Sequence, residues 1–292
     1  MDSSPSRALW RLLEPLHAVT YFSPEPLDAL RAAGYRGFWM GYFAGRAAPL
    51  GAVGPDVVEA VFANFAPARV ARALPAAWDF APPAAALAAR EQGSAAALRR
   101  VLGEAHLADR APVLEVAVGL LEQVVAAAPV AGRPLFAANR AVQAAPDPLV
   151  RLWQLATLLR EHRGDGHVAA LVAAGVGGRE SHVLHALATD TPAEVYRTAR
   201  DFDDAEWQDH LRSLGERGWV REGRLTAEGR AAKAAIEQAT DLAADPPFAV
   251  LTPAELAELR TLLHPLAGRV AASGDLPLDS PMGLDLRTLG GR

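Results

Sequence analysis

The feature that most constrains the fold of this chain is an internal repeat. Trp10 and Trp153 lie in similar apolar segments, 143 residues apart. Three further pairs of similar segments follow in the same order at offsets of 141, 137 and 136 residues: 27–34 with 168–175, 65–74 with 202–211, and 129–133 with 265–269. A shared order at a nearly constant offset indicates duplication, because chance matches would not stay in register. We therefore expect two related units, residues 1–145 and residues 146–292.

The composition fits two globular units. The chain has 292 residues, of which 51% are hydrophobic and 22% charged, so it can bury cores of ordinary size. It contains no cysteine, which excludes disulfides, thiolate metal sites and cysteine nucleophiles. No apolar run reaches the roughly 20 residues of a membrane span, and no signal-peptide pattern opens the chain. We expect a cytoplasmic protein with no membrane partner.

The charge is unevenly divided between the two units. Residues 1–145 contain 13 arginines and 12 acidic residues, whereas residues 146–292 contain 16 basic and 22 acidic residues. A protein whose main task is to grip DNA usually carries a basic surface. Neither unit has a basic excess of that kind, which disfavours DNA as the principal partner.

The second half contains turn and helix-capping signals with a clear physical meaning. Gly218 suits the left-handed position that ends a helix, and residues 219–220 predict a short strand. Gly223 permits a tight turn after that strand. Thr226 and Thr252 can each cap a following helix, the second with proline in its first position.

These signals lie in strings that resemble the MarR family of winged-helix proteins. The strings are Gly215-Glu-Arg-Gly-Trp-Val220, Leu225-Thr-Ala-Glu-Gly-Arg230 and Leu251-Thr-Pro-Ala-Glu-Leu256. In that family they close the recognition helix, leave the wing and start the final helix. The resemblance covers residues 150–270 and implies a recognition helix that begins after Asp203.

The MarR resemblance also implies how the two units are arranged. MarR proteins are twofold dimers whose subunits interlock through their N- and C-terminal helices. Two such units in one chain imply a mainly α fold with minor β wings. The duplicated, degenerate winged-helix units would form an intramolecular pseudo-dimer and the protein would act as a monomer, with a short connection between Arg140 and Pro148.

Three longer strings resemble a group of actinobacterial helix-turn-helix proteins. They are Leu16-His-Ala-Val-Thr-Tyr-Phe22, Gly41-Tyr-Phe-Ala-Gly-Arg-Ala-Ala-Pro-Leu-Gly51 and Glu161-His-Arg-Gly-Asp-Gly-His-Val-Ala-Ala-Leu171. This resemblance implies a helix-turn-helix fold and no particular chemistry.

DNA binding would depend on arginines in the two recognition segments and the wing. The candidates are Arg69 and Arg72 in the first half, and Arg212, Arg221 and Arg224 in the second. The second recognition segment also carries acids at positions 203, 204, 206 and 209, which would repel phosphates. Where the first wing would lie, residues 79–83 contain no basic residue. A protein that reads DNA with twofold symmetry needs two helices able to contact it, and here at most one is suited. A MarR-like DNA-binding transcriptional regulator is therefore the alternative function and not the favoured one.

An aromatic cluster in the first half favours a small-molecule site. Pockets combine apolar walls with a few polar groups, and here five aromatic side chains gather in a chain that is only 7% aromatic. The candidate ligand-binding residues are His17, Tyr21, Phe22, Trp39, Tyr42, Phe43, Arg46, Arg163, Asp165 and His167.

The competing interpretation of the same cluster is ordinary core packing. Phe38, Trp39, Tyr42 and Phe43 have the spacing of one helix face. Arg46 lies in an apolar segment, so it needs a partner, either a carboxylate such as Glu14 or Glu161 or an anionic ligand. Arg163 and Asp165 can equally pair across the interface between the two units.

Histidines in the second half raise the possibility of a metal site. With Asp165 they could supply nitrogen and oxygen ligands to zinc or iron, and they would equally suit a haem protein or an uncharacterised enzyme that uses residues 162–185. The competing interpretation is that Asp165 caps a helix starting at Gly166 and that the histidines are packed or hydrogen-bonded. The metal candidates are His162, His167, His182 and His185.

No complete catalytic signature is present. The chain lacks G-x-S-x-G, a P-loop, G-x-G-x-x-G and H-E-x-x-H, so no catalytic residue is assigned and the sequence identifies no cofactor. The function that the sequence favours is binding of a small molecule, for sensing or sequestration, on a duplicated MarR-like scaffold.

Overall fold

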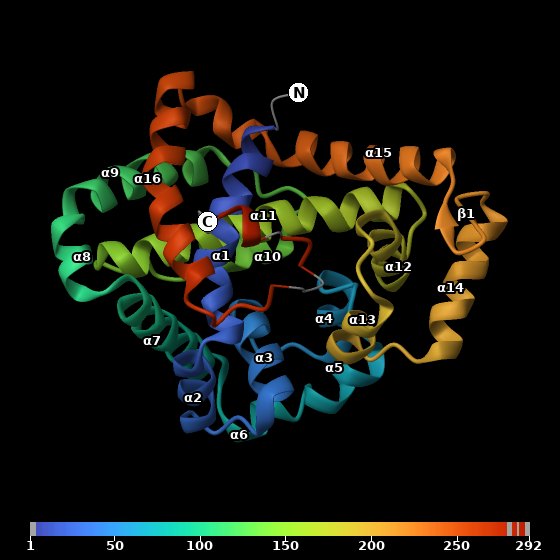
Figure 1. Cartoon of the computed structure of the whole chain (residues 1–292). Coiled ribbons are helices and arrows are strands. Elements are labelled where there is room, and N and C mark those ends of the chain that lie inside the picture. The colour runs from blue at the N-terminus through green and yellow to red at the C-terminus, as the bar shows by residue number, and fades with distance from the viewer. Residues whose placement is uncertain (1–3, 279–281, 285, 290–292) are drawn as a thin grey trace.

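The computed structural model describes residues 4–278, 282–284 and 286–289. The fold is mainly helical, and in the described part of the chain the strands form one two-stranded sheet (Figure 1). This agrees with the expected mainly α fold. No helix among the described residues is long and apolar enough to cross a membrane.

The first half is built of helices alone. They are α1 (Pro5–Phe22), α2 (Pro24–Ala32), α3 (Gly37–Ala47), the 3₁₀ turn η1 (Ala48–Leu50), α4 (Pro55–Val61), α5 (Pro67–Ala73), α6 (Ala77–Phe80), α7 (Pro83–Leu102), α8 (Glu104–Asp109), α9 (Ala111–Ala127) and α10 (Pro134–Arg140). Within residues 4–145 no strand forms, and the short α6 lies where a wing was expected to be missing.

The second half contains the sheet. Its elements are α11 (Pro148–Ala173), α12 (Gly178–Thr189), α13 (Ala193–Arg200), α14 (Asp204–Glu216), β1 (Val220–Arg221), β2 (Arg224–Leu225), α15 (Ala227–Ala244), η2 (Pro246–Val250), α16 (Pro253–Ala272) and η3 (Leu286–Thr288). The connection between α10 and α11 spans residues 141–147, as expected, and Asp147 caps α11 by accepting the amides of Leu149 and Val150.

The local signals of the second half form the structures that they predict. Gly218 has a φ of 72° after α14, and the hairpin turns through Glu222 and Gly223, both in the left-handed region at 52° and 71°. Thr226 caps α15 through the amide of Gly229. Thr252 forms a reciprocal capping box at the start of α16.

One predicted cap is wrong. Residues 162–167 do not precede a helix but lie inside the 26-residue α11, so Asp165 caps nothing on its own helix. Its carboxylate instead accepts the amides of Leu135 and Phe136, at 3.4 and 2.9 Å, in the first turn of α10. Capping therefore acts across the two halves, because α10 docks end-on against the middle of α11.

One of the four repeat pairs is also wrong in detail. Residues 129–133 follow the end of α9, whereas residues 265–269 lie inside α16. Pro265 is accommodated within that helix, so a shared proline and glycine do not mark the same structural position. The other three pairs fall at similar places in the helices of each half.

The core has a central part and two lobes. The central part is formed mainly by α1, α9, α11 and α16, with Trp153 almost fully buried in it. Helix α1 packs against α16, and α11 packs against α9, so each half contributes to both pairs. One lobe contains α3 to α7, and the other contains α12 to α14, the hairpin and α15 (Figure 1). The space between the lobes is where the candidate site lies.

Candidate functional site

A large cavity lies between the two lobes. Its volume is about 920 Å³, and its walls come from α1, α3, α11, α12, α13 and α15, with part of the C-terminal segment at residues 277–288. Cavities of roughly 300–1,000 Å³ are typical of sites that bind small organic molecules. Residues from both halves therefore line one cavity, which is partly open to solvent.

The structure brings together seven of the ten residues that the sequence nominated for ligand binding. Those that line the cavity are Tyr21, Phe22, Trp39, Tyr42, Arg46, Arg163 and His167. His17, Phe43 and Asp165 do not line it. Phe43 is fully buried in the first lobe, and Asp165 is held by α10, so these two belong to the packed interior.

Aromatic side chains from α1 and α3 form one wall. The ring of Tyr42 lies 4.9 Å from that of Tyr21, 5.6 Å from that of Trp39 and 5.4 Å from that of Phe65, measured between centroids. Tyr42 and Trp39 are partly exposed to the cavity, while Phe43 behind them is buried. The helix face predicted as core is thus divided, with its inner side packed and its edge facing the cavity.

A buried ion-pair network lies beside this wall. Glu161, from α11, binds Arg160 at 2.7 Å and Arg46 at 3.3 Å, and Glu14 binds Arg160 at 3.2 Å. The expected carboxylate partner of Arg46 is therefore Glu161. Arg46 also lies 4.0 Å over the ring of Phe62. The cavity wall consequently carries fixed charge rather than free solvent-exposed arginine.

The charges in this network hold each other ionised. Burial alone would raise the pKa of Glu161, but the guanidinium groups of Arg46 and Arg160 lower it to about 2. Burial would lower the pKa of Arg46, yet the Glu161 carboxylate outweighs this and raises it. At neutral pH the cluster is a permanent arrangement of charges.

His17 supports the wall from behind. Its Nδ1 hydrogen-bonds Thr157 at 2.8 Å and its Nε2 hydrogen-bonds the hydroxyl of Tyr21 at 2.9 Å. Burial, and then the nearby Arg160, lower the pKa of His17 well below its ordinary value, so the ring is neutral. His17 thus orients Tyr21 and does not contact a ligand itself.

A second polar cluster joins α1, α11 and α15. Asp241 accepts from both Arg163 and Arg7, each at 2.8 Å, and Glu237 pairs with Lys233. Arg163 therefore takes its ion-pair partner, Asp241, from its own half, and it contacts the other half through a hydrogen bond to Ser6 at 3.4 Å. His167 hydrogen-bonds Thr240 at 2.9 Å next to this cluster.

Arg200 was missed by sequence reasoning and also lines the cavity. It ends α13, and its guanidinium lies 4.5 Å from the ring of Phe65. One nitrogen donates to the carbonyl of Ala199 at 3.0 Å, while its buried Nε has no acceptor in the described structure. Position 200 carries no local signal, since only the folded chain turns this arginine toward the other lobe.

A match to a known family covers both halves of the chain that line the cavity. A helix-turn-helix family matches residues 6–277. The chain belongs to this helix-turn-helix family. No curated protein and no solved structure matches it. Because the match runs through both lobes, the family unit is the whole cavity-containing body and not a single winged lobe.

In this helix-turn-helix protein the first candidate DNA-contacting helix is turned inward. Arg69 is buried, lies 4.0 Å over the ring of Trp39 and pairs with Asp201 of the other lobe. Arg72 pairs with the same carboxylate at 3.1 Å. Both arginines that the alternative function assigned to DNA in α5 therefore take part in a contact between lobes, where Arg69 is buried and Arg72 stays exposed.

The second candidate DNA-contacting unit is more open. Arg212 on α14 is exposed but pairs with Asp209 one turn earlier. Arg221 and Arg224 are the exposed residues of the two-residue strands of the hairpin. The first turn of α14 is acidic, with Asp204 and Glu206.

The histidines do not form a metal site. Within the described residues no group of three or more histidine, aspartate or glutamate side chains is placed to hold a metal ion. His162 packs edge-on against Phe136 at 5.0 Å, and His182 packs against Tyr196 at 5.1 Å. The described structure therefore gives the four metal candidates no common ligand set, although His167, His182 and His185 all line the cavity.

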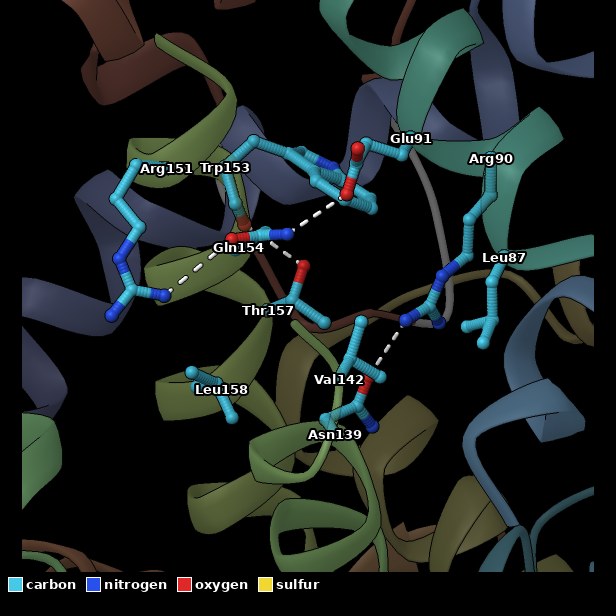
Figure 2. A pocket seen from close by; sticks show the side chains of 10 residues that line it. All are labelled: Leu87, Arg90, Glu91, Asn139, Val142, Arg151, Trp153, Gln154, Thr157 and Leu158. Atoms are coloured by element: carbon cyan, nitrogen blue, oxygen red, sulfur yellow. Dashed lines mark hydrogen bonds between the residues drawn. The ribbon is translucent and has the colours of Figure 1, made fainter. Parts of the chain in front are cut away.

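A second, much smaller pocket lies between α7, α10 and α11. Its volume is about 20 Å³, and Gln154 crosses it to bind Glu91 at 2.8 Å while Arg90 binds Asn139 at 2.9 Å (Figure 2). A space of roughly 10–15 Å³ is needed for one water molecule. This pocket therefore has room for water and none for an organic ligand.

Proposed function

We propose that this helix-turn-helix protein binds a small organic molecule in the cavity between its lobes, as a sensor or a sequestration protein. The observation that carries the proposal is the 920 Å³ space itself, walled by Trp39 and Tyr42 on one side and by charged groups on the other. A well-packed core would not leave so large a volume open, because protein interiors are close-packed.

The scaffold of this proposal is a duplicated MarR-like pseudo-dimer made of residues 1–145 and 146–292. The order of elements supports it: α1 with α2 corresponds to α11, α3 to α12, α5 to α14, α7 to α15 and α9 to α16. Gly34 and Gly175 each follow the first of these helices with positive φ, at 111° and 64°. The exchanged pairs α1–α16 and α9–α11 are those expected of interlocked subunits.

A pseudo-dimer of this kind needs no second chain. We therefore propose a monomer with a mass of 30.8 kDa in solution. Light scattering coupled to size-exclusion chromatography measures this mass directly. A stable species of twice that mass would contradict the proposal.

The second candidate function is DNA-binding regulation, which membership of a helix-turn-helix family favours. The surfaces of the described residues favour small-molecule binding over DNA binding. Arg69 is buried against the other lobe, and the acidic first turn of α14 would meet the phosphates. A gel-shift titration against genomic fragments at moderate salt decides between them, since tight and sequence-selective binding would reverse the order.

The ligand proposal is tested by filling the cavity. Ala199 lines it on α13, whereas Ala205 is exposed on α14. Nile red, an uncharged dye, should bind the native chain and the A205W control, and A199W should bind it at least tenfold more weakly. If A199W binds the dye as the native chain does, the cavity is not the binding site.

A further inference from the structure

The cations that line the cavity differ in how their charge is balanced. Arg46 and Arg160 share Glu161, and Arg163 binds Asp241. Arg200 has no carboxylate within ion-pair distance in the part of the chain that the structure describes. Its donors meet only the carbonyl of Ala199 and the face of Phe65. This guanidinium therefore lies in the wall with most of its hydrogen-bonding capacity unused.

The surroundings of Arg200 are already rich in positive charge. Burial lowers the pKa of Arg200 to about 10, with Tyr42 opposing and Arg46 adding to the effect. A group with that pKa remains protonated at neutral pH. The carboxylates of this cluster are Glu14 and Glu161, and they are paired with Arg46 and Arg160. The positive charge of Arg200 is therefore left without a counter-charge. An unpaired charge in a partly buried site is costly, and an anion from outside would remove that cost.

An apolar surface adjoins this charge. The rings of Tyr42 and Phe65 lie 5.4 Å apart, between Arg46 and Arg200, and Trp39 packs against both. Aliphatic side chains from the second half, including Leu171 and Leu184, extend the lining. A small inorganic anion would leave most of the 920 Å³ unfilled, so the occupant that fits has an extended apolar body.

Arg11 also lines the cavity but is exposed, so water solvates its charge, and the other ionisable groups of the lining are neutral or already paired. Burial lowers the pKa values of His167 and His185 to about 4, so both rings are uncharged at neutral pH. Lys233 is paired with Glu237. These groups can hydrogen-bond an uncharged polar group, but they offer no second unpaired cation. One negative charge on the ligand is what the wall can accept.

We propose that the cavity binds an amphipathic organic monoanion, whose carboxylate or sulfonate head pairs with Arg200 beside Tyr42 and whose apolar body lies against Trp39. This inference rests on the proposed ligand-binding function and adds the chemical class of the ligand. The planar guanidinium of Arg200 can donate two parallel hydrogen bonds to such a head.

The test uses the full chain and two dyes that differ in charge. 8-Anilinonaphthalene-1-sulfonate is an amphipathic anion, and Nile red is neutral. R200M should weaken binding of the anionic dye at least tenfold, which corresponds to about 1.4 kcal/mol, and leave Nile red within twofold. R200K, which keeps the positive charge, should weaken binding of the anionic dye less than R200M does. R31M is the matched control, because Arg31 is an exposed arginine on α2 that pairs with Asp28.

Displacement by unlabelled compounds distinguishes the head groups and the alternatives. Decanoate and decane-1-sulfonate, both monoanions, should displace the anionic dye from the native chain at least tenfold better than decanol does, and their order identifies the preferred head. Equal displacement by decanol, or unchanged binding of the anionic dye to folded R200M, overturns the inference. If R200M does not fold, the comparison of decanoate with decanol on the native chain still decides.

The same experiment separates this inference from the function on which it rests. If Nile red binds the native chain and is lost in A199W, but anions have no advantage over decanol, the cavity binds ligands and the monoanion inference fails. If neither dye binds the folded native chain, both proposals fail.

Discussion

Replacing Glu161 by glutamine tests whether the charge network beside the cavity is a structural necessity. Glu161 is 2% exposed and accepts from Arg46 and Arg160. Its pKa is about 2 instead of the ordinary 4.5, a difference that corresponds to about 3 kcal/mol at about 1.4 kcal/mol per pKa unit. E161Q should reduce the free energy of unfolding by that amount, because it leaves Arg46 without a carboxylate and Arg160 with Glu14 alone.

Urea denaturation followed by tryptophan fluorescence and far-UV circular dichroism measures this loss. The matched control is E122Q, since Glu122 also binds an arginine, Arg151, at 2.7 Å but is half exposed. Pairs on the surface contribute up to about 1 kcal/mol, so E122Q should be close to the native chain. If E161Q loses no more stability than E122Q, the network does not stabilise the fold and the reasoning is refuted.

The pH dependence of the same variant follows from the direction of the pKa shift. The folded chain lowers the pKa of Glu161, so the stability that this carboxylate contributes is fully present above about pH 4.5. It is lost as the pH falls toward about 2. The difference in the free energy of unfolding between the native chain and E161Q should therefore become smaller as the pH falls through this window. A constant difference would show that the ionised carboxylate of Glu161 is not what stabilises the native chain.

Further predictions concern the contact between lobes and the buried histidines. G178A should lower the free energy of unfolding by at least about 2 kcal/mol, because the new Cβ would meet the carbonyl of Ala63 in the other lobe. G119A should raise it by about 0.5–1 kcal/mol, because the space around this glycine of α9 is open. Equal urea midpoints for the two variants would contradict both predictions. Burial lowers the pKa of His167 to about 4, so its protonation favours the unfolded chain as the pH falls from about 6.5 to 4. Over that pH window the free energy of unfolding of H167Q should fall by up to about 2 kcal/mol less than that of the native chain. If the two chains lose stability in parallel, protonation of His167 does not destabilise the fold.

The lobe contact bears on how a helix-turn-helix chain of this kind can work. Asp201 ties α5 to the loop before α14 by binding Arg69 and Arg72. A twofold DNA reader must keep its two recognition helices apart and exposed. Here α5, which the MarR resemblance would make one of these helices, is held against the other lobe through Asp201. The same contact thus disfavours DNA binding through α5.

Local structure in the second half could be predicted well from the sequence. Gly218, Gly223, Thr226 and Thr252 act through neighbours within four positions, so their conformations follow from residue type and spacing. Asp165 shows the limit of this reasoning. An aspartate before a glycine was expected to cap its own helix, but a partner 29 residues away, Phe136, supplied the amide that it caps.

The sequence by itself determined the helical class, the hairpin and the aromatic residues that gather near Tyr42, because these depend on residue type, short spacing and hydrophobic periodicity. Only the tertiary structure decided which side of that cluster is packed and which faces a cavity, that Arg46 binds Glu161 and that Arg69 is taken up by Asp201. It alone placed Arg200 in the wall without a carboxylate. The physical reason is that cavities and unpaired charges depend on distances between residues more than a hundred positions apart, and such distances are fixed only when both halves pack together.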